Sequence, residues 1–306
     1  MRIVFCGTPE FAVEPLKQLI NNQYNVVAVY TQPDRGVGRG RKIQYSAVKQ
    51  YAQEQNIAVI QPKSLKTTDA LTELKALKPD LLVVVAYGLI LPQAALNIAT
   101  ISCWNIHASL LPRWRGAAPI ARALLAGDKT TGVGIMQMQA GLDTGPVYIQ
   151  HECTLANDET AQKLHDKLTI MGASALLECI NLLEKDLLPE PMIQDINQVT
   201  YAHKLEKSEA NISWDETAQQ IDRKIRAFNP WPGVVASIAG DNYKLWQAQV
   251  VSIPSNVKDG EIVKADKNTL IIQCNNSQLQ IDSIQKPGKN RMNIQQFMQA
   301  KTSWYK

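Results

Sequence analysis

Apolar and polar residues alternate in blocks along the first 185 or so residues of the chain. Short, continuous apolar runs are typical of strands in a parallel sheet that is covered on both faces. Between them lie stretches with apolar residues at helical spacing. The pattern predicts strands at residues 2–6, 25–31, 57–60, 80–86, 101–107 and 132–138, helices after Pro9 and at residues 46–55, 69–77 and 159–184, and a polar, glycine-rich loop at residues 32–42.

The pattern changes after Asp186, where Leu188-Pro189-Glu190-Pro191 breaks the helical spacing and residues 190–208 carry no clear period. An amphipathic helix is predicted at residues 215–229. Five short alternating segments follow, separated by turn residues, and such a series is typical of a small barrel. They lie at residues 234–239, 242–252, 261–265, 269–274 and 279–284.

Together these elements predict an α/β chain in two parts. The first is a doubly wound, Rossmann-like domain at residues 1–188. A linker at residues 189–207 leads to a small, OB-like β-barrel domain at residues 208–306.

The bulk composition excludes several classes of protein. Hydrophobic residues make up 45% and charged residues 20%, which fits a globular protein rather than a disordered one. The apolar runs are too short to span a bilayer, and no secretory signal is visible. Five scattered cysteines without a Cys-x-x-Cys pair argue against a disulfide framework or a zinc site. We therefore expect a cytoplasmic protein with no bound metal and no membrane contact.

Positive charge is concentrated in two segments. Residues 31–50 carry five cationic side chains against Asp34 alone, and residues 283–306 carry five with no acidic one. The whole chain has a formal net charge of only +4. The two segments are either two places that contact a polyanion or two solvated loops, and charge alone does not decide between these interpretations.

Asn105 and His107 are the first candidates for chemistry. They lie two residues apart at the end of a predicted strand, so that their side chains point to the same face. Open α/β sheets place their sites at this carboxyl edge. The apolar loop that follows, Leu110-Leu111-Pro112, could wall a pocket for a flat ligand. Alternatively, the two polar residues only finish the strand and the loop belongs to the core.

Asp143 follows the next predicted strand, between Gly141 and Gly145. Such a segment can be an ordinary turn. Combined with Asn105 and His107, it completes a hydrogen-bond donor, an acid–base group and a carboxylate that can orient the imidazole.

This set of residues fits acyl-type transfer to an amine, which is itself the nucleophile. A hydrolase triad is the rival interpretation, and the lack of a Gly-x-Ser-x-Gly segment weakens it. A dinucleotide oxidoreductase is disfavoured because Gly7-Thr8-Pro9 is not Gly-x-Gly-x-x-Gly. The remaining histidines lack metal-ligand spacing.

Asn105-x-His107 followed by Ser109-Leu110-Leu111-Pro112, with Asp143 in Gly-x-Asp-Thr-Gly, resembles the folate-dependent formyltransferases. Further segments narrow the resemblance to the methionyl-tRNA formyltransferases over nearly the whole chain. One departure is Gly36-Val37, where that family often has proline. The segments are Thr31-Gln32-Pro33-Asp34-Arg35, Gly38-Arg39-Gly40, Val85-Ala86-Tyr87-Gly88-Leu89-Ile90-Leu91-Pro92, Arg113-Trp114-Arg115-Gly116-Ala117-Ala118-Pro119-Ile120 and Arg226-Ala227-Phe228-Asn229-Pro230-Trp231-Pro232.

The resemblance implies 10-formyltetrahydrofolate as the formyl donor and the acceptor stem of initiator methionyl-tRNA as the partner. It implies that Asn105 polarises the formyl carbonyl, that His107 stabilises the oxyanion and relays a proton, and that Asp143 holds His107. The residues expected at the folate site are Ile90, Leu91, Ser109, Leu110, Leu111 and Pro112. Those expected at tRNA are Arg35, Arg39, Arg41, Lys42, Lys286, Lys289 and Arg291.

An amino-sugar formyltransferase is the nearest alternative, since it shares the catalytic pattern and a two-domain build. The basic residues 35–42 and Trp114 argue against it. A glycinamide ribonucleotide formyltransferase is a weaker alternative, because that family lacks the second domain. A tRNA-binding module with a vestigial catalytic domain is disfavoured by the intact Asn105, His107 and Asp143.

Overall fold

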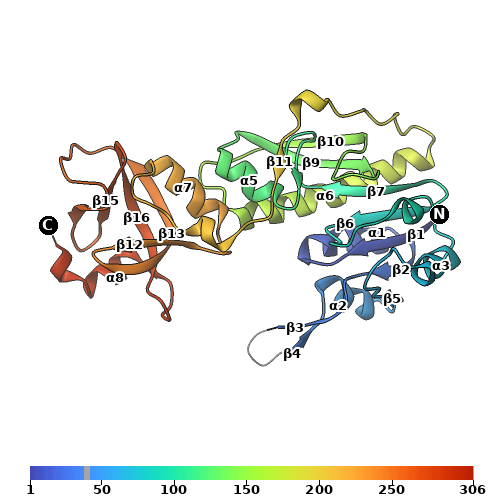
Figure 1. Cartoon of the computed structure of the whole chain (residues 1–306), viewed down its shortest axis with the longest axis horizontal. Coiled ribbons are helices and arrows are strands. Elements are labelled where there is room, and N and C mark those ends of the chain that lie inside the picture. Colours follow the sequence, from blue (N-terminus) through green and yellow to red (C-terminus); the bar gives the residue numbers. More distant parts are fainter. Residues whose placement is uncertain (38–41, 306) are drawn as a thin grey trace. The chain divides into compact units, whose positions relative to one another are not determined.

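The computed structural model describes residues 1–37 and 42–305, apart from the side chains of residues 37 and 42. The chain packs as two compact units, each with its own sheet and core (Figure 1). Unit 1 comprises Met1–Pro119, Thr130–Thr154 and His165–Ala202. Unit 2 comprises Ile120–Lys129, Leu155–Leu164 and the chain from His203 onward. Residues 120–129 and 155–164 thus pack with the C-terminal part of the chain. The domain and linker boundaries at residues 188 and 207 stay predictions.

Unit 1 is built on a seven-stranded sheet with the order β10-β9-β7-β6-β1-β2-β5. The central strand β1 pairs in parallel with β2 on one side and β6 on the other, so the connections reverse direction at β1 and β6. Ligands bind at such a switch point in doubly wound sheets. The strands are β1 (Arg2–Gly7), β2 (Asn25–Tyr30), β5 (Val59–Ile60), β6 (Leu81–Val85), β7 (Ser102–His107), β9 (Thr130–Gln137) and β10 (Val147–Thr154).

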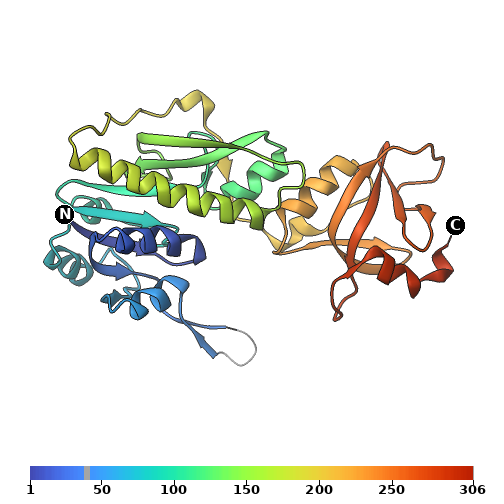
Figure 2. The ribbon, with the colours of Figure 1, turned by 180° about the vertical axis from the view of Figure 1, so that it is seen from behind.

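Helices cover both faces of this sheet. On one face, α3 (Thr68–Ala76) and α4 (Gln93–Leu96) share a core with alternate residues of β1, β6 and β7. On the other face, α1 (Val13–Asn21) and α6 (Ala161–Glu184) lie against the strands, as α6 does in Figure 2. Cys103 belongs to the core on the α3 side. Because side chains alternate along a strand, Asn105 and His107 lie on that same face.

The segment predicted as a loop at residues 32–42 is partly a β-hairpin. Strands β3 (Arg35–Val37) and β4 (Lys42–Gln44) pair antiparallel, with Arg35 opposite Gln44. Below the hairpin, Lys49 of α2 (Ala47–Glu54) forms an ion pair with Asp34, and Gln61 hydrogen-bonds both side chains. The hairpin went unpredicted because its short strands have no apolar alternation.

The chain after α6 packs along unit 1 as an extended segment, which we call the strap (residues 190–202). Met192 pairs with Val147 through two backbone hydrogen bonds. Further on, β11 (Tyr201–Ala202) pairs in parallel with β8 (Arg115–Gly116). Much of the predicted linker is therefore bound to the unit that carries Asn105 and His107.

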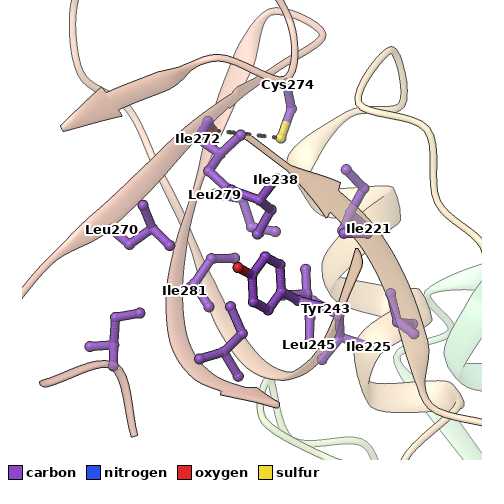
Figure 3. Close-up of a cluster of buried hydrophobic side chains, with 14 of the residues drawn as sticks. Ile221, Ile225, Ile238, Tyr243, Leu245, Leu270, Ile272, Cys274, Leu279 and Ile281 are labelled. Carbon is purple, nitrogen blue, oxygen red and sulfur yellow. Dashed lines mark hydrogen bonds between the residues drawn. The ribbon is translucent and has the colours of Figure 1, made fainter. Parts of the chain in front are cut away.

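Unit 2 holds an antiparallel sheet with the order β12-β13-β16-β15-β14, and a short β17 pairs with β16. Its five main strands correspond to the five predicted ones. The ring of Tyr243 lies in the middle of the core beside Leu245 and Ile281, and Ile225 of the helix α7 lies against them (Figure 3). The elements are α7 (Ala218–Ala227), β12 (Val234–Ile238), β13 (Asp241–Val251), β14 (Ile262–Ala265), β15 (Leu270–Cys274), β16 (Ser277–Gln285), β17 (Met292–Asn293) and α8 (Ile294–Gln299).

Candidate active site

The candidate site lies at the carboxyl ends of β1, β6 and β7, next to the switch point of the sheet. Asn105 pairs with Val84 of β6, and His107 ends β7. The loop after β6 bends sharply here, because Ala86 and Gly88 have φ values of 46° and 78°. Its Tyr87 carbonyl accepts hydrogen bonds from Thr8 and Gln32, which follow β1 and β2. The ends of β1, β2 and β6 are thereby held together.

His107 is almost completely buried, with 5% of its surface exposed. Its Nε2 lies 2.9 Å from the backbone carbonyl oxygen of Trp114. A carbonyl oxygen can only accept, so Nε2 carries the hydrogen in this contact. The other ring nitrogen, Nδ1, lies 3.7 Å from Oδ2 of Asp143. This separation exceeds a hydrogen bond but leaves the carboxylate next to any proton that arrives at Nδ1.

Asp143 lies in a turn between β9 and β10 whose backbone is tightly constrained. Its φ of 51° is in the left-handed region, which aspartate tolerates better than most residues. The Gly116 N–H donates to its Oδ2 over 2.8 Å. Two residues on, a Cβ at Gly145 would lie 1.8 Å from the carbonyl oxygen of Gln137, so only glycine fits.

Asn105 is half-buried, and its carboxamide has no hydrogen-bond partner in the described part of the chain. Its amide therefore has an unused donor beside His107, at the edge of the sheet. This free amide, the imidazole and the Asp143 carboxylate can stabilise negative charge on an oxygen and hold a proton in transit.

The residues predicted to line a folate site differ in exposure. Ile90 is 73% exposed, whereas Leu91 is buried in the core with α3 and α4. Ser109 is fully buried and its hydroxyl donates to the Arg113 carbonyl, while Leu111 packs in a small cluster beneath the loop. Leu110 and Pro112 are half-buried.

The residues predicted to bind tRNA lie in two regions. Arg35 is exposed on β3, while Arg39 and Arg41, with the Lys42 side chain, lie outside the described residues. Lys286, Lys289 and Arg291 are exposed on the connection between β16 and β17 in unit 2. Arg291 hydrogen-bonds Ser283, and its guanidinium lies 5.6 Å from the ring centre of Trp246.

Arg291 and Trp246 also line a groove of about 880 Å³ within unit 2. Its lining has five cationic side chains and two carboxylates, a formal charge of +3. Burial raises the pKa of one carboxyl, Asp222, which forms an ion pair with Arg226. Four of the cations could not be predicted from the sequence, because they are scattered along the chain rather than clustered. These are Lys129, Lys163, Arg223 and Arg226.

Two features are absent from residues 1–37 and 42–305. No three His, Cys, Asp or Glu side chains gather there as metal ligands would. No helix of this part of the chain is both long enough and apolar enough to cross a membrane.

The sequence profile of the formyl transferase family matches residues 1–180, and that of the formyl transferase C-terminal domain matches residues 204–302. The methionyl-tRNA formyltransferase of Methylococcus capsulatus is 49% identical over 300 residues, covering 98% of this chain and 97% of the relative. That of Nitrosomonas eutropha is 47% identical over 298 residues, covering 97% and 94%. The chain belongs to the methionyl-tRNA formyltransferase family. The resemblance seen in the sequence is confirmed, and the chain is a formyl-group transferase.

Solved structures share the fold at low identity. The sugar 3N-formyltransferase WlaRD, solved with dTDP and 5-N-formyl-THF, aligns with a TM-score of 0.66 and 20% identity over 95% of this chain and 99% of that one. HypX from Aquifex aeolicus, in complex with tetrahydrofolic acid, aligns with a TM-score of 0.64 and 16% identity over 97% of this chain. The chain spans about half the length of HypX. The predicted order, a Rossmann-like domain and then an antiparallel β-domain, is confirmed.

Proposed function

We propose that Asn105, His107 and Asp143 catalyse the transfer of a formyl group from 10-formyltetrahydrofolate to the amino group of initiator methionyl-tRNA. The product is N-formylmethionyl-tRNA, with which protein synthesis begins. The observation that carries the assignment is the free Asn105 amide beside a buried His107 whose Nδ1 faces the Asp143 carboxylate.

Each of the three side chains has one task in this reaction. Asn105 donates its N–H to the formyl oxygen as negative charge develops there. His107 receives the proton that the attacking amine loses and passes it to the folate nitrogen that leaves, so the new C–N bond replaces the old one. With Nε2 held by the Trp114 carbonyl, Nδ1 is the nitrogen available for this transfer. Asp143 stabilises the imidazolium while it carries the proton.

The folate donor supplies an activated formyl group. We place this donor at the switch point of the sheet, where doubly wound sheets bind their ligands. Exposed Ile90, on the loop after β6, provides an apolar surface, and Leu110 and Pro112, on the loop after β7, are partly exposed. Buried Leu91, Ser109 and Leu111 support these loops from below, so their contribution is to fix the backbone that contacts the ligand.

We propose that the tRNA binds along the basic surfaces. We assign its acceptor stem to the hairpin of Arg35 and to the neighbouring Arg39, Arg41 and Lys42. The groove of unit 2, together with Lys286, Lys289 and Arg291, would contact phosphates elsewhere on the molecule, because its cations match a polyanion and Trp246 offers a stacking surface. Five cysteines without a disulfide support a reducing, cytoplasmic location.

The test is formylation of charged initiator tRNA with 10-formyltetrahydrofolate as the donor. His107→Ala should lower turnover by at least ~10²-fold while leaving the fold intact. His151→Ala is the matched control, since His151 is half-exposed and bonds Glu178 away from the site. Combined variants at Asn105, His107 and Asp143 should be clearly non-additive, because the three act as one unit. Near-normal turnover by a folded His107→Ala protein would refute the assignment.

A further inference from the structure

Gln194 of the strap connects two parts of unit 1 that are far apart in sequence. Its Nε2 donates to the carbonyl oxygen of Asp143 over 2.8 Å and to that of Gly145 over 2.6 Å. Its Oε1 accepts from Nε of Arg115 over 2.9 Å. The side chain is half-buried, and it reaches the turn of the proposed catalytic carboxylate across 51 residues of sequence.

The orientation of this amide is determined by its three partners. Arg115 is 4% exposed, and its Nε–H needs an acceptor because a buried donor without one is costly. The two carbonyls of the turn need donors. Rotating the amide by half a turn would place its NH₂ against the guanidinium and its oxygen against both carbonyls, so one orientation satisfies all three.

These contacts close a ring around the carboxylate. Arg115 and Gly116 are neighbours in β8, and the Gly116 N–H donates to the Asp143 carboxylate. The Arg115 side chain binds Gln194, which holds the backbone of the Asp143 turn. Asp143 is therefore held at two points: the Gly116 N–H binds its carboxylate, and Gln194 binds its backbone carbonyl.

We propose that Gln194 is a positioning residue that sets the place of Asp143 relative to His107. The inference rests on the proposed function of Asp143. The two groups are 3.7 Å apart, so a small displacement of the turn decides whether the carboxylate can stabilise a proton on Nδ1. Without Gln194 both turn carbonyls lose their donor, and Asp143, whose left-handed backbone is already unfavourable, can relax away.

The decisive variants are Gln194→Met and Gln194→Glu. Methionine keeps the size of the side chain but makes none of the three hydrogen bonds. Glutamate keeps an acceptor for Arg115, yet it has no donor for the carbonyls of Asp143 and Gly145. Gln198→Met is the matched control, because Gln198 lies on the same strap and is exposed, and Asp195 is its side chain's one hydrogen-bond partner among residues 1–37 and 42–305.

We expect Gln194→Met and Gln194→Glu to lower kcat by about 10- to 100-fold, since a misplacement of about 1 Å can cost ~10²-fold. KM for tRNA and for the folate should change little, and Gln198→Met should match the wild type. In an Asp143→Ala background, Gln194→Met should cause no further loss, because its effect passes through the carboxylate.

Wild-type turnover by Gln194→Met would overturn the proposal. Full activity of Gln194→Glu would also overturn it, because it would show that only the bond to Arg115 matters. So would a further loss of kcat when Gln194→Met is added to Asp143→Ala. Circular dichroism and the melting midpoint verify folding. If Gln194→Met fails to fold, Gln194→Asn, one methylene too short to span all three partners, carries the same expectation. Asp143→Ala alone reports on the proposed function, so a failure there is distinguishable from a failure at Gln194.

Discussion

Replacing Gly145 by alanine should disable the enzyme although position 145 carries no reactive group. A Cβ there would lie 1.8 Å from the carbonyl oxygen of Gln137, whereas real Cβ contacts are essentially never below 3.0 Å. The turn must therefore move by more than 1 Å, because the opposing atom belongs to the backbone of β9 and cannot rotate away. Asp143, two residues earlier, moves with the turn.

The cost can be estimated from this displacement. A shift of about 1 Å in a catalytic arrangement can lower the rate by ~10²-fold, or about 2.7 kcal/mol in activation free energy. We expect this loss in kcat for Gly145→Ala. Folate KM should change less than kcat, because the turn itself carries none of the residues assigned to the folate site.

The assay is steady-state formylation of charged initiator tRNA, with Gly134→Ala as the control. Gly134 lies in β9, and a Cβ there would meet its nearest neighbour, the flexible side chain of Gln150, at an ordinary 3.4 Å. This control should keep both activity and melting midpoint close to those of the wild type. A Gly145→Ala enzyme that is folded and turns over at the wild-type rate would show that the turn does not position Asp143.

Three further predictions concern the base of the hairpin, the core of unit 2 and its groove. Hydrogen bonds from Lys49 and Gln61 hold the pKa of Asp34 below its usual range. The ionised carboxylate therefore stabilises the fold at a pH above its unfolded pKa, and this stabilisation is lost as the pH falls through the folded pKa. The melting midpoints of wild type and Lys49→Met should differ at neutral pH and converge in acid. Ile281→Ala should destabilise unit 2 by about 2–5 kcal/mol in denaturant unfolding, because the residue is fully buried. Arg223→Ala should weaken binding of all tRNAs alike and lower the magnitude of the salt slope, log K against log salt, by about 1, and an unchanged slope would exclude a phosphate contact in the groove.

Much of the fold could be predicted because its central strands are buried on both faces. The runs at β1, β2 and β6 are nearly all apolar, and burial makes them visible in the sequence. By contrast, β10 was missed because most of its residues are only half-buried and its pattern is mixed. The hairpin of β3 and β4 was missed for a similar reason.

The site could be predicted in part. The i, i+2 spacing of Asn105 and His107 at a strand end places them together, and Asp143 follows a nearby strand. The Trp114 carbonyl and the Gly116 N–H could not be predicted, because backbone groups leave no signature in residue type. Gln194 could not be found either, since it lies in a stretch without periodicity and meets its partners only through the tertiary fold.

The strap has a consequence for how such a chain could be recombined. Sequence composition alone would suggest exchanging the C-terminal half as a cassette at about residue 188. That junction would replace Gln194 and Thr200, whose side chains bond Arg115 and the Trp114 N–H. In a chimera joined there, the residues that support Asp143 and His107 would come from the other protein. Grafts that keep native sequence through Ala202 retain that support, and residues 120–129 and 155–164, which pack with the C-terminal part of the chain, must be exchanged together with the chain from His203 onward.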